Sequence, residues 1–235
     1  QVQCVWLKDV RCPTSASSHY LADALCSMPN LTDLILGGLY FQEEFFSYLN
    51  AKASTLQVRT VKLQSLRCPT SASSHDHLID ALCSMPNLTE LTLGGRHFHE
   101  EFYSTLNAKA STLQVQTVKL EALRCPTSAS SHHLADALCS MPNLTELTLR
   151  GGDFREVFYS VLNEKASTLQ VQTLELADLQ CPTTASSHHL VDALCSMPNL
   201  TNLKLSGEDF QEEFYCTLNA KASTLQVQTL ELADL

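Results

Sequence analysis

The chain of 235 residues is 44% hydrophobic and carries a formal net charge of −10 at pH 7. This negative charge argues against nonspecific binding to nucleic acid or to an anionic membrane surface. The sequence contains no run of about 18 apolar residues, so we expect no membrane-spanning helix and no membrane insertion.

A leucine-rich frame recurs along the chain in two alternating versions. In the stronger version, as in residues 88–98, leucines occupy the first, fourth and sixth positions; the weaker version, as in residues 115–125, begins with Val115 and closes on Cys125. In chain order the frames begin at Val2, Leu31, Val58, Leu88, Val115, Leu144, Val171, Leu200 and Val227. Steps of 27 to 30 residues are typical of long leucine-rich repeats. We therefore predict one leucine-rich-repeat domain over residues 1–235, with about nine strands. Because the pattern begins and ends within a repeat, we expect a piece of a longer solenoid.

A helix is predicted after each strand. Phe98, Phe102 and Leu106 recur every four residues and form one apolar stripe, and Leu134 and Leu138 begin a second stripe after the weaker strand. One strand and one helix leave an apolar face uncovered, so neighbouring repeats should stack into a parallel sheet. Helices are about 10 Å wide whereas strands lie ~4.8 Å apart. We therefore predict an α/β leucine-rich-repeat solenoid, a horseshoe with the parallel sheet on the concave side and helices on the convex side.

Eight of the ten cysteines occupy repeated positions. One set ends the weaker frame and the other follows a helical leucine; the members are Cys12, Cys68, Cys125 and Cys181, then Cys26, Cys83, Cys139 and Cys195. Both positions suit small buried side chains, and copies of one set lie too far apart for a disulfide. This favours reduced thiols in a cytosolic protein, with a pairing inside one repeat, such as Cys125 with Cys139, as the alternative.

The third, fifth and seventh frame positions should face the concave side. Segments behind the strands are identical in every full copy, whereas these positions change in size and charge. We therefore expect a recognition surface, neutral drift being the alternative. Its predicted residues, with those of the following loops, are Trp6, Asp33, Ile35, Tyr40, Lys62, Glu90, Thr92, Arg96, Lys119, Glu146, Thr148, Arg150, Glu175, Lys204 and Glu231.

Two features of this surface favour a protein partner. Trp6 and Ile35 are apolar at positions that should face solvent, as interface anchors often are; alternatively, Trp6 is exposed only because preceding repeats are missing. The change from Lys62 and Lys119 to Glu175 and Glu231 along the surface could orient a polar partner.

Catalytic and metal-binding functions find no support in the sequence. The histidines cluster at helix starts, as in His132–His133, without other ligands at metal-binding spacing, so we expect surface side chains. No phosphate-binding or nucleophile motif occurs. We predict no cofactor, no metal and no enzymatic activity.

Four Asn-Leu-Thr triplets match the glycosylation sequon. They begin at Asn30, Asn87, Asn143 and Asn199. Each also lies where a helix returns to a strand, so the repeat itself accounts for the triplet. Glycosylation of a secreted protein is the alternative.

The frame Leu88-x-x-Leu91-x-Leu93, with alternating repeat lengths, resembles the ribonuclease-inhibitor class of leucine-rich repeats. The ninth position departs from that class, which has Asn or Cys there: this chain has Arg96 and Leu123, so the turn must be held in another way. The near-identical tandem units also resemble the repeat regions of nucleotide-binding leucine-rich-repeat innate immune receptors (NLR proteins).

This resemblance implies a cytoplasmic sensor or autoinhibitory region that binds a protein or microbial ligand on its concave face. Alternatives are a secreted or cell-surface recognition protein, or an enzyme inhibitor similar to ribonuclease inhibitor. A homodimer through the uncapped terminal repeats is a further expectation.

Overall fold

The computed structural model describes residues 2–10, 12, 14–38, 41–66, 72–179, 181–207 and 210–233. Its strands are β1 (Cys4–Lys8), β2 (Asp33–Gly37), β3 (Thr60–Gln64), β4 (Glu90–Gly94), β5 (Thr117–Glu121), β6 (Glu146–Arg150), β7 (Thr173–Ala177), β8 (Asn202–Ser206) and β9 (Thr229–Ala233). The helices between them are α1 (Ser15–Cys26), α2 (Glu43–Lys52), α3 (Ala72–Ser84), α4 (Glu100–Lys109), α5 (Ser128–Ser140), α6 (Glu156–Lys165), α7 (Thr184–Ser196) and α8 (Glu212–Lys221). Each even-numbered helix continues into a short 3₁₀ turn: Ala53–Thr55, Ala110–Thr112, Ala166–Thr168 and Ala222–Thr224.

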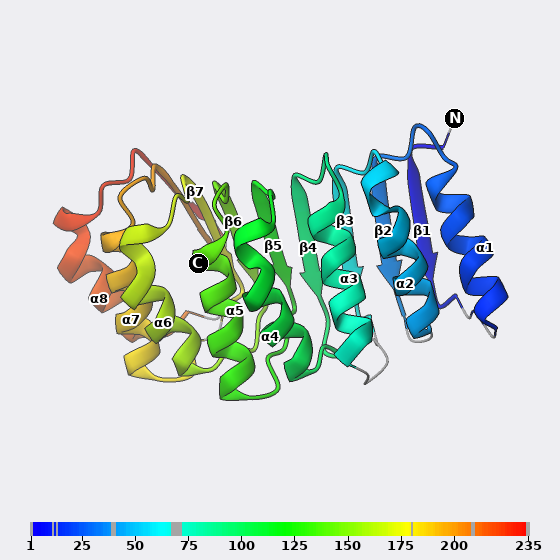
Figure 1. Ribbon diagram of the computed structural model, residues 1–235. Helices are drawn as coiled ribbons and strands as arrows, with labels where there is room; N and C mark the ends of the chain where they lie inside the picture. The colour runs from blue at the N-terminus through cyan, green and yellow to red at the C-terminus, as the bar shows by residue number, and fades with distance from the viewer. Residues whose placement is uncertain are drawn as a thin grey trace.

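The nine strands form one parallel sheet in chain order, with every strand starting at the third frame position. The helices lie in a single layer on one side of this sheet (Figure 1). The predicted α/β leucine-rich-repeat solenoid, with a concave sheet and convex helices, is confirmed.

The core is a continuous ribbon between sheet and helices. From β2 to β8, the side chains at the fourth and sixth positions, such as Leu91 in β4 and Leu120 in β5, are buried. From the helix side, Phe98 and Phe102 stack with ring centroids 4.4 Å apart. Apolar area removed from water in this ribbon stabilises each repeat against its neighbours.

The turns after β1 to β8 are each held by a left-handed residue at the eighth frame position. The weaker repeats use Asp9, Ser65, Ala122 and Asp178, whereas the stronger repeats use Gly38, Gly95, Gly151 and Gly207. At this position each N–H donates to the carbonyl that ends the next strand, as from Ser65 to Gly94 at 2.7 Å. This backbone ladder takes the place of the side-chain ladder that the ninth position lacks.

Glycine is required at some of these turns by close packing as well as by its positive φ. A Cβ atom added to Gly95 would lie 2.7 Å from the Cα atom of Ser65 in the preceding repeat. The alternation of glycine with larger residues at the eighth position therefore follows from the contact between the two repeat types.

The Asn-Leu-Thr triplets also serve the frame. Asn143 Nδ2 donates to Gln114 Oε1 of the preceding repeat at 2.7 Å, and the Thr145 hydroxyl donates to the carbonyl of Gln116 at 3.3 Å. The same amide contact joins Asn87 to Gln57 and Asn199 to Gln170. In these three copies the asparagine of the triplet therefore joins neighbouring repeats.

The cysteines that the structure describes are free thiols, including Cys125 and Cys139, the alternative disulfide pair. Cys12, Cys125 and Cys181 are buried, as predicted for the end of the weaker frame, and Cys68 lies outside the described residues. Burial raises the pKa of the Cys125 thiol to about 11 and that of Cys139 to about 12. Both are therefore protonated and unreactive near neutral pH.

Candidate functional site

The concave face presents the predicted recognition residues, with two exceptions. Tyr40 lies outside the described residues. Thr92 is buried, whereas every other predicted residue is exposed or half-buried. Arg96 is exposed in the loop after β4, and the remaining residues lie on the sheet itself.

The expectation that Thr92 faces solvent is wrong. Its exposed fraction is 0%, and its hydroxyl has no hydrogen-bond partner among the described residues. In the sheet register Thr92 lies between Lys62 and Lys119, whose side chains are much longer. Lys119 Nζ on β5 is held 2.7 Å from Glu90 Oε1 on β4, so the Lys119 side chain reaches over the strand that carries Thr92. A short side chain between long neighbours is covered by them.

Two of the four charged residues in the predicted change of charge are neutralised by ion pairs within the molecule. Lys119 pairs with Glu90 on β4, and Glu231 pairs with Lys204 Nζ at 2.9 Å. Lys62 and Glu175, in contrast, have no ion-pair partner among the described residues. Lys62 therefore remains available to a ligand near the first strands. The pKa of Lys204 is raised by its hydrogen bond to Glu231 and also by Glu175, which lies opposite it in the sheet register.

A pocket opens beside Trp6 at the carboxyl ends of the first strands. It has a volume of about 360 Å³ and is lined by Trp6, Lys8, Asp9, Gly37, Gly38, Gln64, Ser65 and His97. The Trp6 side chain is 60% exposed, and its neighbour across the sheet is the half-buried Ile35. The ammonium group of Lys8 lies 5.8 Å from the Trp6 ring centroid. Its volume is enough for one side chain of a partner, and Gly37 and Gly38 contribute only backbone atoms to its lining.

Sequence reasoning identified Trp6 but not the residues around it. Lys8, Gly37 and Gln64 all occupy the seventh frame position on adjacent strands. A glycine beside a tryptophan on a surface of larger side chains is the signal that could have located the pocket.

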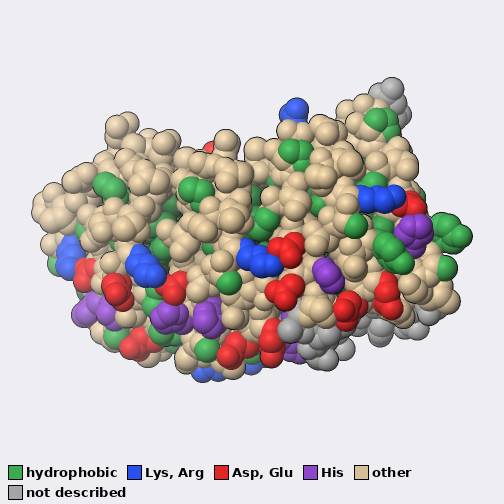
Figure 2. Space-filling model, in the orientation of Figure 1, with side chains coloured by type: hydrophobic (Ala, Val, Ile, Leu, Met, Phe, Trp, Pro, Cys, Tyr) green, Lys and Arg blue, Asp and Glu red, His purple; other side chains and the backbone are tan. Residues whose placement is uncertain are grey.

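The helix face has a different character. Figure 2 shows acidic, basic and histidine side chains in a band across the helices. Much of this band is one ion pair repeated in every unit: Asp23–Lys52, Asp80–Lys109, Asp136–Lys165 and Asp192–Lys221. Within the described part of the chain, no group of three or more His, Cys, Asp or Glu side chains is placed to hold a metal ion. None of the helices that the structure describes is both long and apolar enough to cross a membrane.

The prediction that the helix-start histidines lie on the surface is wrong for His75. This side chain is fully buried against Phe102, with ring centroids 6.3 Å apart, and both ring nitrogens lack a partner among the described residues. The second unit has one extra residue before Leu78, which moves His75 into the buried place that Ser131 and Ser187 occupy in later units. Burial lowers the pKa of His75, so the neutral ring is favoured.

The alternating repeats, the nine parallel strands and the outer layer of helices define a leucine-rich-repeat protein, and its repeats resemble those of the ribonuclease-inhibitor class and of NLR receptors. Human NACHT, LRR and PYD domains-containing protein 13 is 28% identical over 221 residues, which cover 92% of this chain and 21% of that protein. Human NACHT, LRR and PYD domains-containing protein 12 is 27% identical over 233 residues, with the same coverage of 92% and 21%. The chain thus spans about a fifth of each of these relatives.

No protein-family model matches the chain. The crystal structure of the leucine-rich repeat-containing protein LegL7 from Legionella pneumophila aligns with a TM-score of 0.43 and 16% sequence identity, covering 98% of this chain and 91% of that one.

Proposed function

We propose that this chain is the sensing region of an NLR-like cytoplasmic receptor and that it binds a protein or microbial ligand through its concave face. The observation that carries the proposal is the pocket beside Trp6. An exposed aromatic ring next to Ile35 offers an apolar anchor, and Lys62 supplies a free charge beside it. Interfaces commonly combine such an anchor with a charged rim.

The geometry favours a partner that places an apolar side chain beside Trp6 and an acidic group near Lys62. Further along the sheet, Glu175 would then face a basic group of the same partner. This arrangement fixes the direction in which an extended ligand lies across the strands.

The test compares exposed aromatics on the two faces. Trp6→Ala removes the anchor on the concave face, whereas Tyr20→Ala removes a ring that is 71% exposed on α1. Proteins captured from cytosol by the unmodified chain should be retained by Tyr20→Ala and lost with Trp6→Ala and with Lys62→Glu. Purified candidates are then titrated calorimetrically, and equal affinity for Trp6→Ala and the unmodified chain would refute the proposed site.

A secreted protein is distinguished by mass. After expression in a secreting eukaryotic cell, the proposal predicts an intact mass with free thiols and no added hexose at the four Asn-Leu-Thr triplets. Added hexose together with the loss of thiol protons would instead support the secreted alternative.

Self-association is a separate part of the proposal. Leu230 and Leu232 of β9 are 46% and 54% exposed, whereas the corresponding Leu174 and Leu176 of β7 are fully buried. Two copies could cover these leucines in a homodimer. Sedimentation equilibrium of the chain, with Leu232→Lys as the variant expected to be monomeric, tests this directly.

A further inference from the structure

The third unit departs from the other three at the start of α6. Arg155 stands where the other units have Gln42, His99 and Gln211, and Val157 stands where they have Glu44, Glu101 and Glu213. One substitution adds a positive charge and the other removes a negative one. Both changes lie where the loop after β6 meets the start of α6, and not on the concave face.

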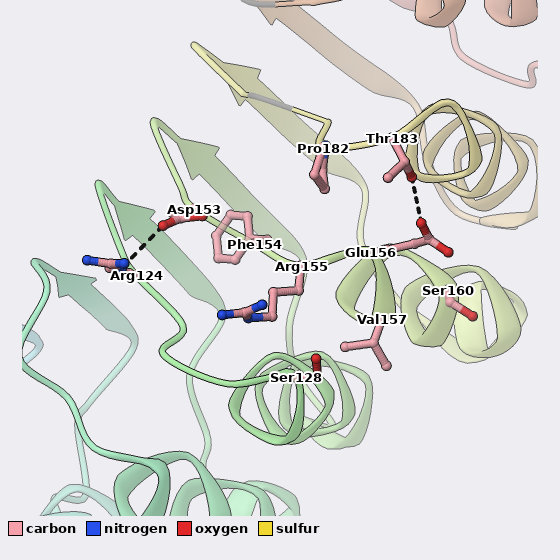
Figure 3. A pocket seen from close by; sticks show the side chains of 10 residues that line it. All are labelled: Arg124, Ser128, Asp153, Phe154, Arg155, Glu156, Val157, Ser160, Pro182 and Thr183. Carbon is pink, nitrogen blue, oxygen red and sulfur yellow. Dashed lines mark hydrogen bonds and ion pairs between the residues drawn. The ribbon is translucent and has the colours of Figure 1, made fainter.

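These residues line the pocket of Figure 3, which has a volume of about 770 Å³. Its lining comes from the segment after β5, the loop before α6, the first turns of α6 and the residues that begin α7; the members are Arg124, Ser128, Asp153, Phe154, Arg155, Glu156, Val157, Ser160, Pro182 and Thr183. A volume of this size is in the range of small-molecule sites.

Two guanidinium groups lie at one end of this pocket (Figure 3). Arg124 is held through its Nε atom, 3.2 Å from Asp153 Oδ2, and Arg155 Nη2 donates to the carbonyl of Pro126 at 3.1 Å. The backbone N–H of Arg155 also donates to the Ser131 hydroxyl at 3.3 Å, which fixes the loop. Among the described residues, the other terminal nitrogens of both arginines have no partner, so they are available to an anion.

Two acidic side chains line the pocket, and both are engaged: Asp153 pairs with Arg124, and Glu156 lies at the opposite end. Glu156 Oε2 accepts a hydrogen bond from the Thr183 hydroxyl at 2.6 Å. Between the two ends, Val157 is half-buried and Pro182 is exposed, so the wall offers apolar surface where the other units carry a glutamate. Because Asp153 offsets the charge of Arg124, Arg155 leaves one unbalanced positive charge at that end of the pocket, with apolar surface beside it.

We propose that this pocket binds a small organic anion, with its carboxylate or phosphate group between Arg124 and Arg155 and its apolar part against Val157 and Pro182. Guanidinium groups bind these anions through paired, charge-assisted hydrogen bonds. The site is separate from the concave face, so it stands or falls independently of the function proposed above.

The test uses phenyl phosphate, benzoate and inorganic phosphate as probes in calorimetric titrations of the whole chain. Phenyl phosphate should bind more tightly than inorganic phosphate because only the former has an apolar part. Benzoate binding would show that a carboxylate suffices, and benzoate failing where phenyl phosphate binds would exclude carboxylates from the proposal.

The variants come from the other units of the same chain. Arg155→Gln installs the residue found at positions 42 and 211, and Val157→Glu installs the residue found at positions 44, 101 and 213, so both should fold. Each should weaken phenyl phosphate binding roughly tenfold or more, since each removes a charge-assisted contact or adds a like charge. The matched control is Arg150→Gln, an exposed arginine of the same unit outside the pocket, for which we expect an unchanged affinity.

Three outcomes would overturn the proposal. The first is no saturable binding of phenyl phosphate by the unmodified chain at millimolar concentration. The second is binding that Arg155→Gln and Arg150→Gln weaken equally, which would show only attraction to surface charge. The third is equal affinity for phenyl phosphate and inorganic phosphate, which would refute the apolar half of the site.

Discussion

The helix face and the concave face of this molecule use charge in different ways. On the helix face, an aspartate of one helix and a lysine of the next form the same ion pair in all four units. On the concave face, Lys119 pairs with Glu90 of the preceding strand whereas Lys204 pairs with Glu231 of the following strand. Lys62 and Glu175 have no such partner among the described residues.

This difference separates scaffold from recognition surface. A contact that recurs in every unit holds adjacent repeats in the same relation, as the Asp–Lys pairs do. A contact that occurs once cannot serve the frame, so it belongs to the local chemistry of the surface. Internal repetition thus provides a comparison within one chain, and substitutions at repeated and unrepeated positions can test it.

Leu120→Asp should lower the free energy of unfolding by about 4 kcal/mol, because it buries an unpaired charge in a close-packed layer. Leu120 is 0% exposed, whereas the adjacent Glu121 is half-buried on the concave face. Urea unfolding monitored by circular dichroism measures both variants, with Glu121→Ala as the control. If the two variants were equally stable, the inward and outward assignments of the frame would be wrong.

His75 should make stability depend on pH. Burial lowers the pKa of His75, and the nearby His99 adds to this effect, while Glu101 and Asp76 oppose it. The unfolded chain therefore binds a proton that the folded chain excludes, so stability is greatest above about pH 6.5 and falls as the pH drops below it, by at most about 1.4 kcal/mol per pH unit.

The matched variant is His75→Ser, which installs the residue found at positions 18, 131 and 187. Denaturant unfolding of both proteins at several pH values isolates the contribution of His75, since all other histidines are unchanged. A pH dependence that His75→Ser leaves intact would show that another group titrates.

Thr92→Val should raise the free energy of unfolding by about 1 kcal/mol, because it replaces a buried hydroxyl without a partner by a methyl group of the same shape. The control is Thr148→Val at the same position of the next strong strand. Thr148 is half-buried and lies between Lys119 and Glu175, so its hydroxyl can reach water. Thermal unfolding should show a higher midpoint for Thr92→Val alone, and equal midpoints would mean that Thr92 is hydrated.

These residues also show where sequence reasoning succeeds and where it ends. The spacing of leucines located the start of all nine strands because an apolar period depends only on residues close in sequence. The burial of Thr92 depends on Lys62 and Lys119, which come from strands about one repeat away. The place of His75 depends on where a one-residue insertion is absorbed, and the Trp6 pocket is lined by residues of three adjacent strands. Such features require the register between strands, which the pattern within a repeat does not contain.

Lys165→Ala should cost about 0.5 kcal/mol, the usual contribution of an ion pair near the surface. Lys165 Nζ lies 2.6 Å from Asp136 Oδ1, and this hydrogen bond raises the pKa of the lysine. Lys62→Ala on the concave face is the comparison, and its stability should be unchanged because Lys62 has no ion-pair partner to lose among the described residues. Chemical denaturation at low and high salt measures both, and the difference between them should shrink as salt screens the pair. If Lys62→Ala proved as costly as Lys165→Ala, Lys62 would belong to the scaffold, and the concave face would have one free charge fewer to offer a ligand.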